Sequence, residues 1–155
     1  MRAVGIILAG GNSNKMRELT HKRAVAAMPI AGSYRAIDFA LSNMSNSHIQ
    51  KVAVLTQYNA RSLNEHLNSS KWWDFGRKQG GLYVFTPTIT AENGYWYRGT
   101  ADAIYQNLDF LKRCHEPYVI ITSGDAVYKM DYNKVLEYHL SLIHISEPTR
   151  HAQIS

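Results

Sequence analysis

The chain has 155 residues, of which 45% are hydrophobic and 19% are charged, and its formal net charge is +5 at pH 7. This composition is typical of a globular domain and excludes a disordered chain, and no apolar run approaches the roughly 18 to 20 residues of a membrane span. The 17 Lys and Arg residues are spread along the chain, so they predict no nucleic-acid partner.

The start of the chain and its cysteine content favour a cytoplasmic location. The first residues lack the basic start, long apolar core and small-residue cleavage site of a signal peptide. The single cysteine, Cys114, cannot form an internal disulfide, which fits a reducing compartment. We therefore expect a cytoplasmic protein with no membrane partner.

The stretch AVGIILAGGNSNKM near the start reads as a buried strand followed by a polar loop. Ile6, Ile7 and Leu8 are consecutive apolar residues, which is typical of a strand buried on both faces. Gly10 and Gly11 then allow a close backbone approach, so the loop can direct N–H groups at a phosphate. A simple tight turn is the alternative reading of the two glycines.

A dinucleotide-binding fold also opens with a strand followed by glycines. Its G-x-G-x-x-G pattern needs an acidic residue about 20 positions later. Here Gly11 is followed by Asn12, Ser13, Asn14, Lys15 and Met16. The pattern therefore disfavours an oxidoreductase.

Helix and strand signals alternate along the next part of the chain. RAIDFALSNM (residues 35–44) has its apolar residues at helical spacing, and KVAVLT (51–56) predicts a second strand. A short helix is expected from Ser62, because Ser62 and Glu65 match a capping box. GGLYVFTP (80–87) predicts a third strand that ends at a proline.

The segment 100–114, TADAIYQNLDFLKRC, carries the strongest helix signal. Thr100 is the expected N-cap and Asp102 lies in the first turn, where the helix dipole favours a negative charge. One face of this helix is expected to be apolar, with Ala101, Ile104, Tyr105, Leu108 and Leu111 on it.

A central strand over 118–122 and a helix over 131–139, capped by Asp131, complete the pattern. The alternation predicts an α/β fold with a mostly parallel sheet and crossover helices. Ligands of such sheets bind beyond the carboxyl ends of the strands, where Gly10 and Gly11 meet Gly124 and Asp125. We expect Asp125 to reach a Mg²⁺ ion on the phosphates, with a helix cap or turn as the alternative role.

The segment YWYRGTADA, residues 95–103, is a second candidate for nucleotide contacts. Arg98, Gly99 and Thr100 stand at a helix start beside three aromatic residues, which suits a nucleotide ring and its phosphates. A capped helix that packs on an aromatic cluster explains the same residues.

The last sixteen residues, LSLIHISEPTRHAQIS, resemble the in-frame translation of a transposase sequencing adapter. We therefore divide the chain into 1–139, the N-terminal part of a domain, and 140–155, a stretch that is not native. The alternative is a genuine strand over 140–145.

Six segments, ILAGG, LTHKRA, YRAIDFALSN, TQYN, YRGTADA and SGD, occur in an order that resembles the bacterial ADP-glucose pyrophosphorylases, the glucose-1-phosphate adenylyltransferases of glycogen synthesis. The resemblance covers residues 1–139 and is strongest to the D-type (GlgD-type) companion subunit. It implies a Rossmann-like nucleotidyltransferase domain, truncated here, followed in the family by a left-handed β-helix that this chain lacks.

The resemblance also implies a reaction and a site. ATP and glucose-1-phosphate are joined to give ADP-glucose and pyrophosphate, with Mg²⁺ as the cofactor. It assigns Gly10 and Gly11 to the nucleotide phosphates and Lys15 and Asp125 to catalysis, with Asp125 also as the metal ligand. The base and ribose are then bordered by Gln57, Gly99, Thr100, Ala101 and Asp102.

Two positions depart from the catalytic members of the family. Lys15 stands where they have arginine, and Val25 stands where they have lysine, so two cationic contacts with phosphate are altered or lost. We therefore expect a weakly active or regulatory subunit that works with a catalytic sister subunit in a hetero-oligomer. The alternatives are a fully catalytic enzyme and a nucleotide-sensing module without catalysis. We also expect the fragment alone to be inactive and marginally folded, with an unpaired sheet edge.

Overall fold

A computed structural model describes residues 2–11, 14–20, 22–69, 73, 75, 80–87 and 96–151. Its elements follow in chain order: β1 (Ala3–Leu8), η1 (Asn14–Thr20), η2 (Val25–Ala27), β2 (Pro29–Ile30), β3 (Tyr34–Arg35), α1 (Ala36–Asn46), β4 (Lys51–Leu55), α2 (Arg61–Ser69), β5 (Gly81–Phe85), α3 (Thr100–Gln106), α4 (Leu108–Arg113), β6 (Tyr118–Ser123) and α5 (Tyr132–His151). Strands and helices alternate as the sequence predicts.

Four strands form one sheet in the order β5-β4-β1-β6, and every neighbouring pair is parallel. Val4 of β1 pairs with Lys51 of β4 and with Val119 of β6, so the first strand lies between strands that come much later in the chain. The predicted α/β class is confirmed. The β2-β3 hairpin, a separate antiparallel pair, has no counterpart in the sequence-based prediction.

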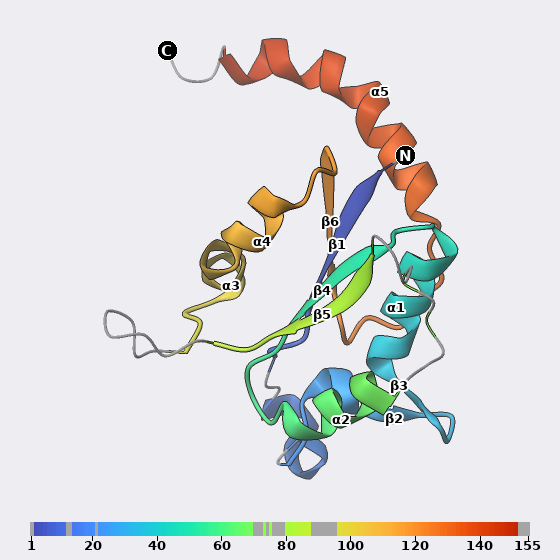
Figure 1. Cartoon of the computed structure of the whole chain (residues 1–155), viewed down its shortest axis with the longest axis vertical. Coiled ribbons are helices and arrows are strands. Elements are labelled where there is room, and N and C mark those ends of the chain that lie inside the picture. Colours follow the sequence, from blue (N-terminus) through green and yellow to red (C-terminus); the bar gives the residue numbers. More distant parts are fainter. Residues whose placement is uncertain are drawn as a thin grey trace.

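One face of the sheet is covered by α1, α2 and the start of α5 (Figure 1). Ile37, Leu41 and Met44, the apolar stripe of α1, are fully buried here against the strands. Gly5 of β1 permits this contact, because a Cβ there would lie 2.8 Å from the Met44 sulfur. This face holds most of the core.

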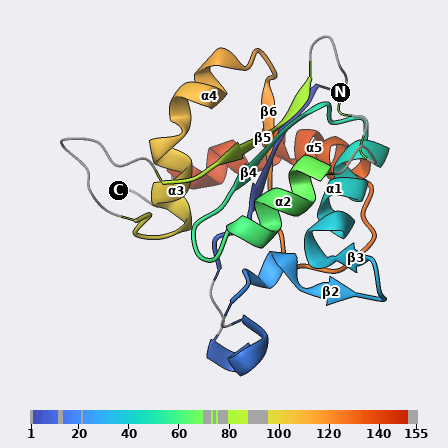
Figure 2. The same ribbon diagram turned by 60° about the horizontal axis from the view of Figure 1, so that its bottom comes forward.

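The opposite face is covered by α3 and α4 alone among the described helices (Figure 2). Its buried cluster is small: Ile6, Leu55, Tyr97 and Ala103. The rings of Tyr83, Phe85 and Phe110 pack beside it, with centroids 5.1 to 6.4 Å apart.

The capping box predicted at Ser62 is wrong. Helix α2 begins at Arg61, and the Asn64 N–H donates to Ala60 O, so Ser62 lies inside the helix. The Ser62 hydroxyl and carbonyl instead accept hydrogen bonds of 2.8 Å from Arg35 Nη1. Glu65 pairs with Arg61 one turn away, at 3.1 Å.

The single helix predicted over 100–114 is in fact two helices, α3 and α4, separated by Asn107. The Asn107 Nδ2 donates to Ala103 O at 2.8 Å and to the Tyr97 hydroxyl at 3.0 Å, so its side chain competes with the regular helical ladder. The predicted apolar face is also wrong in part. Ala101 and Tyr105 are exposed, while Ala103 is buried.

Strand β6 lies at an edge of the described sheet, so its predicted central position is wrong. Helix α5 begins as predicted, because the Asn133 N–H donates to Asp131 Oδ1 at 3.0 Å. The stretch 140–151 continues α5 and does not form the strand considered for 140–145. Among the described helices, none combines the length and apolar character needed to cross a membrane.

Candidate nucleotide-binding site

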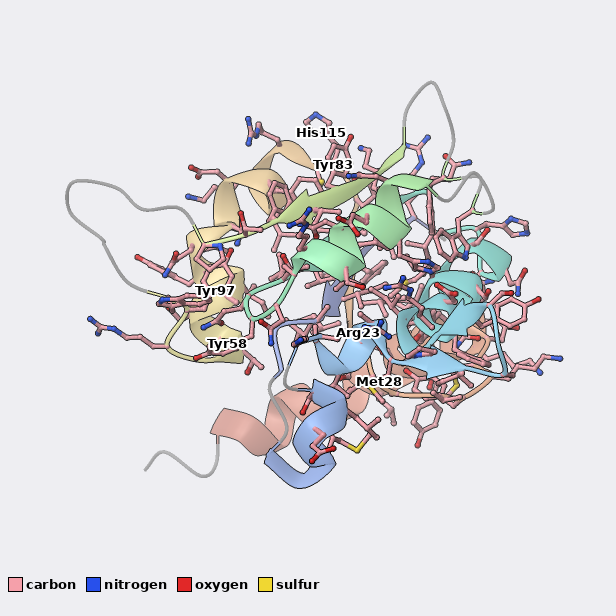
Figure 3. All side chains as sticks on the ribbon, turned by 90° about the horizontal axis from the view of Figure 1, so that it is seen from below. Arg23, Met28, Tyr58, Tyr83, Tyr97 and His115 are labelled. Carbon is pink, nitrogen blue, oxygen red and sulfur yellow. The ribbon has the colours of Figure 1, made fainter. Side chains whose placement is uncertain are left out.

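The carboxyl ends of the strands open onto a cavity of about 500 Å³. In Figure 3, which views this end, Tyr58 and Tyr97 lie beside α3, and Arg23 and Met28 lie across from them near η2. The cavity is lined by residues from the loops after the strands and from two helix starts: Leu8, Ala9, Gly10, Gly11, Val25, Ala26, Leu55, Gln57, Tyr58, Tyr97, Arg98, Gly99, Thr100, Ala103, Ser123 and Asp125.

The two glycines after β1 differ in what surrounds them. A Cβ at Gly10 would lie 3.0 Å from the Gln57 Cβ, so glycine here permits the close approach of two loops. A Cβ at Gly11 would meet no other described atom within 4 Å. No described neighbour explains the glycine at 11, and its small size leaves cavity space for a ligand.

Asp125 reaches the same cavity from the end of β6. The Gly124 N–H donates to Leu8 O at 2.9 Å, which extends the β1-β6 ladder by one bond. A Cβ at Gly124 would lie 3.2 Å from both the Ala26 Cβ and the Ile7 Cγ2, a tight contact, so glycine lets β6 leave the sheet this close to η2 without moving its neighbours. Asp125 itself is exposed, and Ser123 Oγ donates to its Oδ1.

The start of α3 forms another wall. Gly99 and Thr100 line the cavity, and Gly99, not Thr100, is the N-cap. Ala101 and Asp102 are not among the described lining residues. Asp102 Oδ2 instead accepts hydrogen bonds of 2.9 Å from the Arg98 N–H and from Gln106 Nε2, which stabilises the first turn of the helix.

Gln57, which follows β4, connects the sheet to the segment before α3 by a hydrogen bond. Its Nε2 donates to Tyr97 O at 3.2 Å, and Tyr97 is buried against Ile6 and Leu55. Burial raises the pKa of the Tyr97 phenol, so that hydroxyl stays neutral. The side chains of Tyr58 and Trp96 stack at the rim, with ring centroids 5.0 Å apart and planes 14° from parallel.

The charge of the described cavity wall is low. Arg98 is its one described basic side chain and Asp125 its one described acidic side chain. Val25 lines the cavity, at the position where the resemblance calls for lysine. Lys15 falls in η1, but its side chain lies outside the described part of the structure.

The described side chains at the cavity suit a metal ion that binds together with a nucleotide better than a metal ion that the protein holds by itself. Within the described residues, no group of three or more His, Cys, Asp or Glu could hold an ion alone. Asp125 offers one carboxylate beside open cavity space. Mg²⁺ in proteins is commonly bound by one or two carboxylates together with substrate phosphates and water.

Sequence reasoning therefore brought Gly10, Gly11, Gln57, Thr100 and Asp125 to the cavity that they all line. Gly99, also predicted, lines the cavity as well, and so does Tyr97 of the candidate segment 95–103. Sequence reasoning did not name Ser123 and Ala26 as wall residues. The strand-end rule had pointed near Ser123, whereas the place of Ala26 depends on tertiary packing that carries no local signal.

Comparisons with known proteins identify the family of the chain. The family model described as "Nucleotidyl transferase" matches residues 4–144. A glucose-1-phosphate adenylyltransferase of Thermosipho africanus is 48% identical over 136 residues, which are 88% of this chain and 33% of that protein. One from Clostridium perfringens (strain SM101 / Type A) is 50% identical over 136 residues, 88% of this chain and 35% of that protein. The chain spans about a third of the length of these relatives.

Proposed function

The chain belongs to the nucleotidyl transferase family, and we propose that it supplies the nucleotide-binding part of a glucose-1-phosphate adenylyltransferase of glycogen synthesis in the cytoplasm. The observation that carries the proposal is the meeting of the Gly10-Gly11 loop and Asp125 at one cavity. The names of the relatives support ATP and glucose-1-phosphate as the substrates.

In the proposed reaction, a phosphate oxygen of glucose-1-phosphate bonds to the α-phosphorus of ATP. The bond from that phosphorus to the oxygen bridging to the β-phosphorus breaks, and pyrophosphate leaves with the electron pair. The attacking oxygen is already anionic, so no general base is needed, and positioning and charge neutralisation carry the catalysis.

Each part of the cavity wall has a role in this scheme. The N–H groups at Gly10 and Gly11 bind nucleotide phosphates, and the side of Gln57, Gly99 and Thr100 borders the base and ribose. Asp125 holds a divalent cation, expected to be Mg²⁺, which neutralises phosphate charge when it is bound.

The low charge of the described wall supports the further proposal that the whole subunit is weakly active or regulatory and assembles with a catalytic sister subunit. Val25 offers neither charge nor donor to a phosphate. Loss of one catalytic electrostatic contact costs about 2.7 to 4 kcal/mol, or about 100-fold to 1,000-fold in rate. Turnover of the whole subunit alone that equals that of its sister would contradict the regulatory role. If the subunit binds ATP but shows no pyrophosphate exchange, even when mixed with a catalytic sister subunit, a nucleotide-sensing module would be favoured.

The site assignment is tested by titrating the chain with Mn²⁺ and ATP and following water-proton relaxation, which reports the bound metal. We expect Asp125→Asn to weaken binding at least about tenfold, since a charge-assisted contact contributes about 1.5 to 3 kcal/mol. We expect Val25→Lys to strengthen it several-fold, because it restores a cation at the cavity wall.

Two matched exchanges serve as controls. Asp131→Asn makes the same change at the exposed cap of α5, where asparagine also caps well, and Val135→Lys makes the same change on the exposed side of α5. Both should bind like the unaltered chain. If Asp125→Asn binds as tightly as Asp131→Asn, the metal and nucleotide assignment is wrong.

A further inference from the structure

The segment between β6 and α5, residues 124–131, carries Asp125 but has few apolar contacts of its own. Val127 is 50% exposed, and Tyr128 and Met130 are exposed as well. Burial of these side chains therefore contributes little to fixing the path of the backbone. Hydrogen bonds to other elements must do so.

Those hydrogen bonds come from two buried polar side chains, Asn43 of α1 and Ser47 at the C-cap of that helix, which are 4% and 2% exposed. Asn43 Nδ2 donates to Tyr128 O at 2.9 Å, and Asn43 Oδ1 accepts from the Met130 N–H at 3.1 Å. Ser47 Oγ accepts from the Tyr132 N–H at 2.9 Å. The two side chains lie about one turn apart, so they hold the backbone at residues 128 and 130 of the segment and at 132, the first residue of α5.

The type of side chain at 43 matches the groups it meets. The segment presents a carbonyl at 128 and an N–H at 130, and a primary amide offers one donor and one acceptor in fixed geometry. Packing of α1 does not require this amide, because Ile37, Leu41 and Met44 already bury the helix.

A second set of contacts joins Tyr128 of the segment to β6 and to the start of α5. The Tyr128 hydroxyl lies 2.7 Å from Thr122 Oγ1 and 3.1 Å from the Tyr132 hydroxyl. Burial raises the pKa of Tyr132 to about 12, so its hydroxyl remains protonated over the ordinary pH range. The far end of the segment is therefore held both by α1 and by the strand it leaves.

Resting on the proposed function, we propose that Asn43, assisted by Ser47, is a positioning residue that fixes the Asp125 carboxylate for the metal-nucleotide complex. Asp125 lies between two anchored points, Gly124, bonded to Leu8 O, and Tyr128, bonded to Asn43. Only residues 125–127 separate these points, so loss of the Asn43 contact loosens the backbone beside Asp125 and leaves Tyr128 held through its hydroxyl alone. Groups that orient a metal ligand typically matter about 10-fold to 100-fold in metal affinity when removed.

The test is a double-mutant cycle on the 155-residue chain, with Mn²⁺ and ATP affinity measured by water-proton relaxation. Asn43→Ala should weaken the affinity about tenfold in the unaltered chain and should have no effect in Asp125→Asn. Asn43→Asp keeps the size and the acceptor but sets an anionic oxygen against Tyr128 O, so it should weaken binding at least as much. Asn46→Ala, the same exchange on the exposed side of α1, should bind like the unaltered chain.

Ser47→Ala removes only the last contact and should weaken binding by a smaller factor, so it tests the proposal even if Asn43→Ala does not fold. An equal loss from Asn43→Ala with and without Asp125 would overturn the positioning role and leave a structural one. No loss from Asn43→Ala or Ser47→Ala, with a loss from Asp125→Asn, would overturn this inference alone. No loss from Asp125→Asn would instead refute the proposed function.

Discussion

The two faces of the sheet are built differently. The face under α1, α2 and α5 buries a continuous cluster that includes Ile7, Leu41 and Val54. The face under α3 and α4 buries four residues, adds the Tyr83, Phe85 and Phe110 rings, and leaves Val119 and Ile121 of β6 exposed. An ion pair lies on this second face, where Lys51 Nζ and Glu116 Oε1 are 2.9 Å apart.

The difference shows where stability and binding come from. The well-packed face carries α1, and Asn43 of α1 and Ser47 at its C-cap hold the backbone after β6. The rigid packing of this face therefore supports one side of the cavity. The thinner face carries α3, whose start forms the other side. We infer that the α3 side of the cavity is the more easily deformed of the two.

The largest expected effect is on the well-packed face. Leu41→Ala removes a fully buried side chain among close-packed neighbours, so the free energy of unfolding should fall by about 3 to 4 kcal/mol. Urea unfolding followed by circular dichroism measures it. Leu19→Ala, the same exchange at an exposed position, should cost about 0.5 kcal/mol or less. Equal losses at the two leucines would contradict the packing difference.

An intermediate effect is expected from the ion pair. Burial raises the pKa of Glu116, but the hydrogen bond and charge of Lys51 outweigh it and hold this pKa below its ordinary 4.5. A carboxyl group whose pKa is lower in the folded state stabilises the fold above its unfolded pKa. That stabilisation is lost as the pH falls through the lower, folded value.

Glu116→Gln should therefore lower stability by about 1 kcal/mol at pH 7 and by progressively less below about pH 4.5. Urea midpoints measured from pH 7 down to about pH 3 give the profile. Glu65→Gln, which breaks the exposed Arg61 pair, is the control and should shift stability little. A loss at Glu116 that does not change with pH would show that the charge is not responsible.

The smallest effect is expected from Ile121 of β6 on the thinner face, and its neighbour Ile120, on the other face, is the matched control. Ile120 points into the large core and is 8% exposed, whereas Ile121 points to the other side and is 51% exposed. Ile121→Thr should change the free energy of unfolding by about 0.5 kcal/mol or less. Ile120→Thr should cost about 2 kcal/mol, since it buries an added hydroxyl and loses apolar contact. Similar losses would mean that Ile121 is covered in solution.

Much of the fold was predictable because its signals are local. The buried run of β1, the apolar spacing of α1 and the Asp131 cap each depend on neighbouring residues, and each appears where expected. The break at Asn107 and the role of Ser62 were missed, because each depends on a distant partner, Tyr97 for one and Arg35 for the other. The same holds for β6, whose edge position depends on the sheet order.

The cavity was predictable to the extent that parallel strands bring their carboxyl ends together. That rule and the family resemblance located Gly10, Gly11, Gln57 and Asp125. They did not show that Asp102 hydrogen-bonds its own helix, or that Asn43 reaches the backbone after Asp125. Contacts of that kind depend on the packing of α1 and α3 against the sheet, which spacing in the sequence does not encode.

The strand order also governs how the chain assembles. Ala3 pairs with Tyr118, so β1 and β6 can meet only once the long segment between them has been synthesised. Pairing of such distant segments pays a large loop-closure cost before any contact compensates for it, and sheets of this kind nucleate slowly. The edge of β1 that β6 covers therefore stays unpaired until β6 has been made, which is the interval when a chaperone would have most to protect.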